Sequence, residues 1–228
     1  MNVDDVTEVE KVYDHLVIDA IFEKQKTLME KYDPIEEKNG ANVPHPPYRI
    51  DDVKVQARVK DLAWRITEEI SEAIEFEEDL DFSNWKNRWK DDHEIRHFFE
   101  EMADALHFLT ELSIVTDLDM VIITDTYDQL VVNGNVEDCS KSGPNHLALR
   151  IWCMGVIRKL GLACNCLKNK YWKNTHMATD DEKFKDLLYG VWREYLLLMA
   201  NLGVGPQELY SLYFKKNQVN QFRIRSNY

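Results

Sequence analysis

Hydrophobic and polar residues follow one another along this chain with a helical period. The long segments between its 8 glycines and 6 prolines repeat apolar side chains every three or four residues, not at every second residue. The breaks in this pattern predict loops at 39–47, 133–144 and 173–180. The predicted helices cover residues 5–32, 53–80, 93–117, 146–171, 181–202 and 206–218. The expected fold class is all-α, with residues 1–228 forming one domain because no long linker divides them.

Composition and charge narrow the classes of function. Hydrophobic residues make up 44% of the 228 residues, enough for a sizeable core, and the net charge of −13 would repel nucleic acid from most of the surface. An acidic protein that handles polyphosphates needs metal cations. The four cysteines lack zinc-finger or disulfide-scaffold spacing, the N-terminus is acidic, and no apolar run is long enough to span a membrane. We expect a cytoplasmic protein with neither a nucleic acid nor a membrane as partner.

The predicted helix over 53–80 carries carboxylates on its apolar face. At about 100° per residue, Glu69 lies within about 20° of Leu62, which is on that face. Glu72 lies beside Glu69 one turn further along, whereas Glu68 points away from the face. The helix therefore offers an i, i+3 pair of acids at the surface that should meet the core.

The next predicted helix, over 93–117, has the same arrangement. Glu101 falls about 60° from Phe98, the reference residue of the apolar face, and Asp104 flanks Glu101. His107 falls on the opposite side of the helix from Phe98, so we interpret it as a residue that packs or supports the site. Two helices thus each direct a pair of carboxylates toward the core.

Inward carboxylates need protons, cationic partners or metal ions, because burying a bare charge is costly. Hard oxygen ligands suit Mg²⁺, with Mn²⁺ as an alternative, and the four candidates are Glu69, Glu72, Glu101 and Asp104. A solvated helix edge paired with Lys and Arg is a second interpretation. A di-iron bundle is a third, although it needs two Glu-x-x-His pairs and the chain has one, Glu94 to His97.

The C-terminal segment carries a specific motif. Residues 210–223 are Tyr-Ser-Leu-Tyr-Phe-Lys-Lys-Asn-Gln-Val-Asn-Gln-Phe-Arg. This stretch is similar to the Tyr-x-x-Lys-Asn-x-x-Asn-x-Phe-Arg signature of the dimeric dUTPase family, one of the all-α nucleotide pyrophosphatases. The acid pairs at 69–72 and 101–104 resemble the metal site of that family, and residues 85–90 resemble its Trp-Lys-x-Trp-Lys segment. The resemblance runs from about residue 20 to the last residue.

Residues of the C-terminal motif are equipped to bind phosphate. Lys216, Asn220 and Arg223 bring two cations and an amide together, and their spacing of four and three places them on one face of a helix. Without the resemblance, a basic helix end that stabilises the macrodipole is the favoured explanation of these residues. With it, the expected phosphate-binding residues are Lys216, Asn220, Arg223, Lys86, Lys90 and Tyr228.

The resemblance also implies a fold, a reaction and a base-binding set. It implies a helical bundle, assembled as a homodimer, that uses Mg²⁺ to split a deoxynucleoside triphosphate into monophosphate and pyrophosphate by attack at the α-phosphorus. Glu69 is the expected general base because its apolar setting raises its basicity, with Glu68 as the alternative. The expected base-binding residues are Gln25, Trp89 and Asn217.

The first helix departs from the family at the base-binding position. The family pairs a Gln with an Asn one turn later, whereas Gln25 is followed here by Leu28 and Met29. Loss of one amide could change the choice between uracil and cytosine by about tenfold or more. The sequence therefore favours dUTP as substrate, with dCTP or a mixture of both as the first alternative. A non-catalytic helical protein that binds a nucleotide or a partner is the second alternative.

Overall fold

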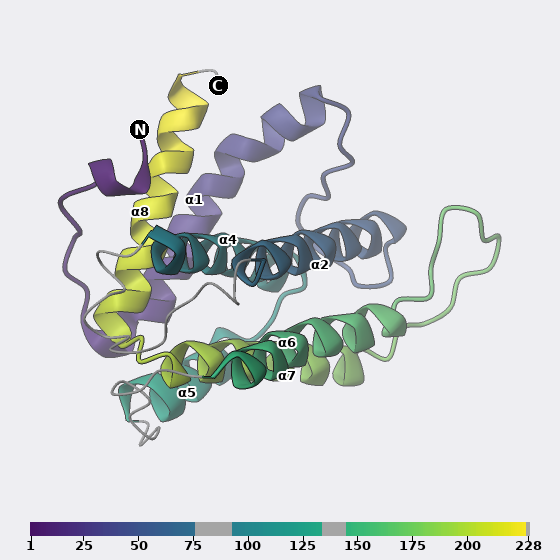
Figure 1. The fold of residues 1–228 in the computed structure, drawn as a ribbon. Coiled ribbons are helices and arrows are strands. Elements are labelled where there is room, and N and C mark those ends of the chain that lie inside the picture. Colours follow the sequence, from purple (N-terminus) through teal and green to yellow (C-terminus); the bar gives the residue numbers. More distant parts are fainter. Residues whose placement is uncertain (76–92, 134–144, 227–228) are drawn as a thin grey trace.

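The computed structural model describes residues 1–75, 93–133 and 145–226, and these ranges are helical almost throughout (Figure 1). They contain no strand, which confirms the all-α prediction. Short 3₁₀ turns lie at η1 (Val3–Asp5) and η2 (Asp14–Leu16), and a π-helical turn, η4 (Asp128–Val132), follows α5. The α-helices are α1 (Val17–Lys38), α2 (Val53–Ala73), α4 (His93–Val115), α5 (Met120–Tyr127), α6 (His146–Cys166), α7 (Asp181–Asn201) and α8 (Pro206–Arg225).

The helices pack as pairs around one core. The closest partners are α2 with α4 and α6 with α7, while α1 and α8 lie against each other and against α4. Figure 1 shows α1 and α8 crossing the α2/α4 pair steeply, with α6 and α7 on the other side. The pair α2/α4 is antiparallel, because Arg58 near the start of α2 contacts Glu111 near the end of α4, whereas Glu69 meets Glu101.

Local sequence signals explain where several helices begin and end. The side chains of Asp52, Asn145 and Asp180 each accept a hydrogen bond from a backbone N–H in the first turn of α2, α6 and α7. Gly203 follows α7 with φ at +77°, a left-handed conformation that suits glycine. Pro206 then opens α8 at a first-turn position, where a missing N–H costs nothing.

The first predicted helix is wrong at its start. The valines of residues 6–12 repeat every third residue, yet this segment is not helical, and α1 begins at Val17 instead of residue 5. Valine is a modest helix former, and long-range bonds hold the segment extended: Gln207 Nε2 donates to the Val12 carbonyl at 2.8 Å. At the other end α1 continues through Pro34 to Lys38, because Glu36 is held there by two arginines of α2.

Other predicted boundaries also needed correction. The helix predicted over 53–80 ends at Ala73, and residues 76–80 lie outside the described ranges. The ends predicted at 117, 171, 202 and 218 fall at 115, 166, 201 and 225. Helix α5 and the π-helical turn were not predicted, because the β-branched residues of this segment have a low helix propensity. The side chain of Asp119 nevertheless caps the first turn of α5. None of the helices in the described ranges has an uncharged apolar stretch of the length that crossing a bilayer requires.

Candidate active site

The facing surfaces of α2 and α4 bring three of the predicted acids together. One carboxylate oxygen each of Glu69, Glu72 and Glu101 lies within 4.8 Å of the other two. Apolar side chains of both helices bury the neighbouring turns, including Ile66, Ile70 and Met102. The i, i+3 spacing in α2 and the antiparallel partner helix therefore produce a compact cluster of hard oxygen ligands, and this group contains no histidine.

Asp104, the fourth predicted acid, lies beside this cluster and pairs with a cation. Its Oδ2 is 2.6 Å from Nζ of Lys216 on α8, and both side chains are largely buried. Burial raises the pKa of Asp104 to about 6, although the ion pair with Lys216 opposes the rise. The family signature on α8 thus reaches the acid pair of α4 directly.

The carboxylate of Glu69 has the most perturbed ionisation among the described acids of the cluster. Burial raises its pKa to about 8, helped by the negative charge of Asp104 and by contact with Glu101 and Glu72. Near neutral pH the cluster therefore retains a proton that a divalent cation would displace. A donor set made of carboxylate oxygens fits Mg²⁺ or Mn²⁺.

A cavity of about 280 Å³ opens beside the acid cluster, between α1, α2, α4 and α8. We call it the Gln25 cavity. Its lining combines aromatic rings, the side-chain amides of Gln25 and Asn220, and charged groups. The residues that line it include Gln25, Tyr32, Glu69, Asp104, Phe108, Asn220 and Arg223. A pocket that combines apolar side chains with directed polar groups is typical of a small-molecule site.

Gln25 is held at the wall of this cavity by two buried side chains. Tyr213 O–H donates to Gln25 Oε1 at 2.9 Å, and His107 Nδ1 lies 2.8 Å from the same oxygen. His107 is 4% exposed and stacks on the Tyr213 ring, and burial lowers its pKa to about 3, so it is neutral. The packing or supporting role predicted for His107 agrees with this position, and Gln25 faces the cavity with a fixed amide.

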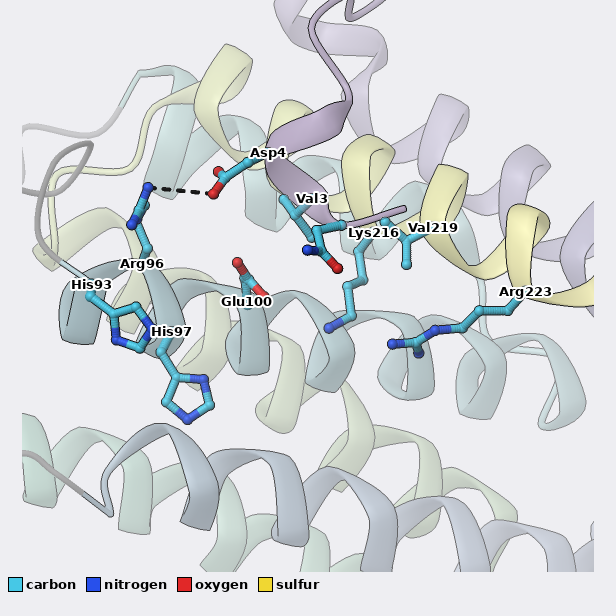
Figure 2. Close-up of a pocket in the computed structure, with 10 residues that line it drawn as sticks. Val3, Asp4, His93, Arg96, His97, Glu100, Lys216, Val219 and Arg223 are labelled. Atoms are coloured by element: carbon cyan, nitrogen blue, oxygen red, sulfur yellow. Dashed lines mark hydrogen bonds and ion pairs between the residues drawn. The ribbon is translucent and has the colours of Figure 1, made fainter. Parts of the chain in front are cut away.

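A second cavity, of about 240 Å³, is lined by Lys216 and Arg223 of α8 and by residues of α4 (Figure 2). We call it the Arg96 cavity. Lys216 and Arg223 extend from α8 toward α4, and Arg96, His93 and His97 line the α4 side. Arg223 lines the Gln25 cavity as well. The two cavities therefore adjoin along one row of cations, with the acid cluster beside them.

Some of the other predicted site residues lie in the described ranges and some lie outside them. Asn217 is buried one turn after Tyr213, and Asn220 lines the Gln25 cavity. Glu68 is exposed on α2. Lys86, Trp89, Lys90 and Tyr228 lie outside the described residues. Lining residues that sequence reasoning did not identify include Tyr32 and Phe108, for which the one available signal is that Phe108 follows Asp104 by one helical turn.

Comparison with known proteins assigns this chain to a family. Residues 17–228 match the model of a family described as dUTPase. The match includes both acid pairs and all of α8, and the segment of residues 1–16 precedes it. Comparison with curated proteins and with solved structures gives no match.

Proposed function

The chain belongs to the dUTPase family and is a dUTP diphosphatase-like nucleoside triphosphate pyrophosphohydrolase, and on that premise we propose that it converts dUTP to dUMP and pyrophosphate with Mg²⁺. The observation that carries the proposal is the position of the acid cluster beside two adjoining cavities. The Gln25 cavity offers aromatic and amide groups to a nucleoside, and the Arg96 cavity offers cations to phosphates. The bond to be cleaved would lie between them.

The residues proposed to hold the metal are Glu69, Glu72 and Glu101, with Asp104 beside them. Their oxygens are the ligands that Mg²⁺ prefers, and Mn²⁺ suits the same set. When bound, such a cation neutralises phosphate charge and lowers the pKa of water. Asp104 would exchange its ion pair with Lys216 for the cation, which would leave the Lys216 ammonium to the substrate.

Proton transfer and charge stabilisation fall to groups of the chain itself. Glu69 is our proposed general base, because it lies in the acid cluster between turns of buried apolar side chains, a setting that makes a carboxylate more basic than an ordinary Glu. Glu68, exposed on α2, is a less suitable base. Lys216 and Arg223 would bind the phosphate oxygens that gain charge as pyrophosphate departs.

The amide of Gln25 supports uracil over cytosine. The Tyr213 hydroxyl occupies one lone pair of its Oε1, and the His107 tautomer with its proton on Nδ1 occupies the other, so with this tautomer Gln25 meets a ligand through its N–H donors. An N–H donor matches the 4-carbonyl of uracil and opposes the 4-amino group of cytosine. This donor compensates in part for the family Asn that Leu28 and Met29 replace.

Gln25→Leu is expected to lower the ratio of kcat/KM for dUTP over dCTP by at least about tenfold, because the discriminating donor is lost. Steady-state kinetics with both substrates measures this ratio. Gln218→Leu, on α8 and outside the lining of the Gln25 cavity, is the matched control and should keep the wild-type ratio. An unchanged ratio in Gln25→Leu would show that Gln25 does not select the base.

A panel of substrates tests the proposed function itself. Purified protein with Mg²⁺ should release pyrophosphate from dUTP faster than from dCTP, dTTP, dATP or dGTP. Preference for dCTP would replace dUTP by the first alternative without changing the reaction. Absence of pyrophosphate release from every substrate would contradict the proposal and favour a non-catalytic binding protein.

We also propose that the enzyme is a homodimer. Four large apolar side chains lie exposed along one face of α6: Leu147, Ile151, Met154 and Leu162. This exposed apolar face, in which Arg158 lies between Met154 and Leu162, has the character typical of a protein interface. Trp192 of α7 is fully buried and therefore does not contribute to this surface.

Light scattering should give about twice the chain mass of 26.9 kDa for the wild type. Ile151→Glu should shift the mass toward that of one chain, because a charge at the centre of an apolar interface is costly. A monomeric wild type would contradict the proposal. The cytoplasmic location and the single-domain organisation of residues 1–228 stay predictions.

A further inference from the structure

The segment before α1 is a strap fixed to the body of the enzyme, although it precedes the part of the chain that matches the family. We use the name strap for residues 2–14. Gln207 of α8 donates to the Val12 carbonyl at 2.8 Å and to Asp14 at 2.6 Å, and Glu10 pairs with Lys24 of α1 at 2.7 Å. Val6 is buried in the core. These anchors determine where the first residues of the strap lie.

The first turn of the strap forms a wall of the Arg96 cavity. Asn2, Val3 and Asp4 line it opposite Arg96, and Figure 2 shows the Asp4 carboxylate directed at the Arg96 guanidinium. The two groups are 3.4 Å apart, and their side chains are 67% and 37% exposed. An exposed ion pair of this length contributes little stability. A more highly charged anion could therefore replace Asp4 at low cost.

The charges of the Arg96 cavity suit a polyphosphate. In a protein of net charge −13, basic side chains make up half of its lining: His93, Arg96, His97, Lys216 and Arg223. Two carboxylates, Asp4 and Glu100, oppose them. The proposed function uses Lys216 and Arg223, at the end of the cavity nearest Asp104, and gives no role to the basic side chains that α4 contributes to the lining. A triphosphate whose α-phosphate lies at the acid cluster would extend its remaining phosphates past Lys216 toward Arg96.

We propose that Arg96 binds the outermost phosphate of the substrate and of the pyrophosphate product, and that Asp4 of the strap occupies Arg96 until a phosphate displaces it. The exchange breaks one ion pair and forms another, and no covalent bond changes. A guanidinium gains more from phosphate oxygens than from an exposed carboxylate, because it can make two parallel charge-assisted hydrogen bonds. The identity of the ligand rests on the proposed function.

Calorimetric titration of inorganic pyrophosphate into the Mg²⁺-loaded protein tests this proposal. Arg96→Met is expected to weaken binding about tenfold, the loss typical of one charge-assisted contact, and Arg96→Lys by less. Asp4→Asn is expected to tighten binding about threefold, because the competing carboxylate is gone. Lys185→Met removes a cation paired with Asp181 at 3.3 Å on α7 and should bind pyrophosphate like the wild type.

Titration with dUMP distinguishes binding of the outer phosphates from binding of the rest of the substrate. This product has no β- or γ-phosphate, so Arg96→Met should leave its affinity unchanged while the affinity for pyrophosphate falls. Equal pyrophosphate affinity in wild type and Arg96→Met would overturn the inference even if dUTP turnover is intact. Loss of affinity for both ligands would overturn it too, because Arg96 would then support the site as a whole. A different outcome is that the protein hydrolyses no dUTP but still binds pyrophosphate through Arg96. That result would refute the proposed function and support phosphate binding in the Arg96 cavity.

Discussion

Glu69→Gln is expected to lower kcat for dUTP hydrolysis by about 10³-fold, within the range typical of losing a general base. The substitution removes the carboxylate that contacts Glu101 and that burial makes most basic. It also removes the negative charge from one of the three residues whose oxygens cluster within 4.8 Å. The shape of the side chain is kept, so the fold should persist. Pyrophosphate release at saturating dUTP and Mg²⁺ measures the effect.

Glu68→Gln is the matched control for this prediction. Glu68 precedes Glu69 on α2 but is exposed, so its substitution makes the same chemical change outside the acid cluster. It should retain kcat within about twofold, as surface changes away from a site usually do. If Glu68→Gln lost activity and Glu69→Gln kept it, the assignment of the base would be reversed. Thermal unfolding of both variants excludes a folding defect as the cause.

Arg58→Met is expected to lower the free energy of unfolding by about 3–5 kcal/mol, the loss typical of breaking a buried ion pair. Arg58 is 6% exposed on α2 and joins two other helices. Its guanidinium lies 2.5 Å from Glu111 of α4 and 2.7 Å from Glu36 of α1. Methionine fills similar space but leaves both carboxylates without this cation. Urea unfolding followed by circular dichroism measures the change.

The loss in Arg58→Met should be larger at pH 8 than at pH 5. Burial raises the pKa of Glu111 even with Arg58 in place, and removal of the arginine raises it further. A carboxyl whose pKa is raised on folding stabilises the protein below its unfolded pKa, and this contribution is lost as pH rises through the folded value. Arg65→Met, whose side chain is 32% exposed beside Glu36, is the control and should cost about 1 kcal/mol or less. Equal losses in the two variants would contradict the account.

Helical periodicity was sufficient to predict which acids meet. Glu69 and Glu101 repeat in phase with apolar residues of their helices, and two apolar faces of this kind pack against each other. The antiparallel contact of α2 and α4 then brings the acids into one cluster. The spacing of Lys216 and Arg223 predicted that they share a face of α8, whereas their selection as phosphate ligands depended on the resemblance of the C-terminal motif to the family.

Contacts between distant parts of the chain could not be predicted. The pairing of Asp104 with Lys216 depends on how α8 crosses α4, and the donors that occupy Gln25 come from two other helices. The strap appeared helical because its valines repeat every third residue, whereas side chains from α1 and α8 hold it extended. Local patterns predict an element and its buried face but not the partner it meets.

Product analysis in ¹⁸O-labelled water tests the central claim most directly. If the acid cluster directs water to the α-phosphorus of dUTP, phosphorus NMR and mass spectrometry should show dUMP carrying one ¹⁸O atom and unlabelled pyrophosphate. Label in pyrophosphate would contradict attack at the α-phosphorus. Formation of dUDP and inorganic phosphate would contradict the pyrophosphohydrolase reaction itself.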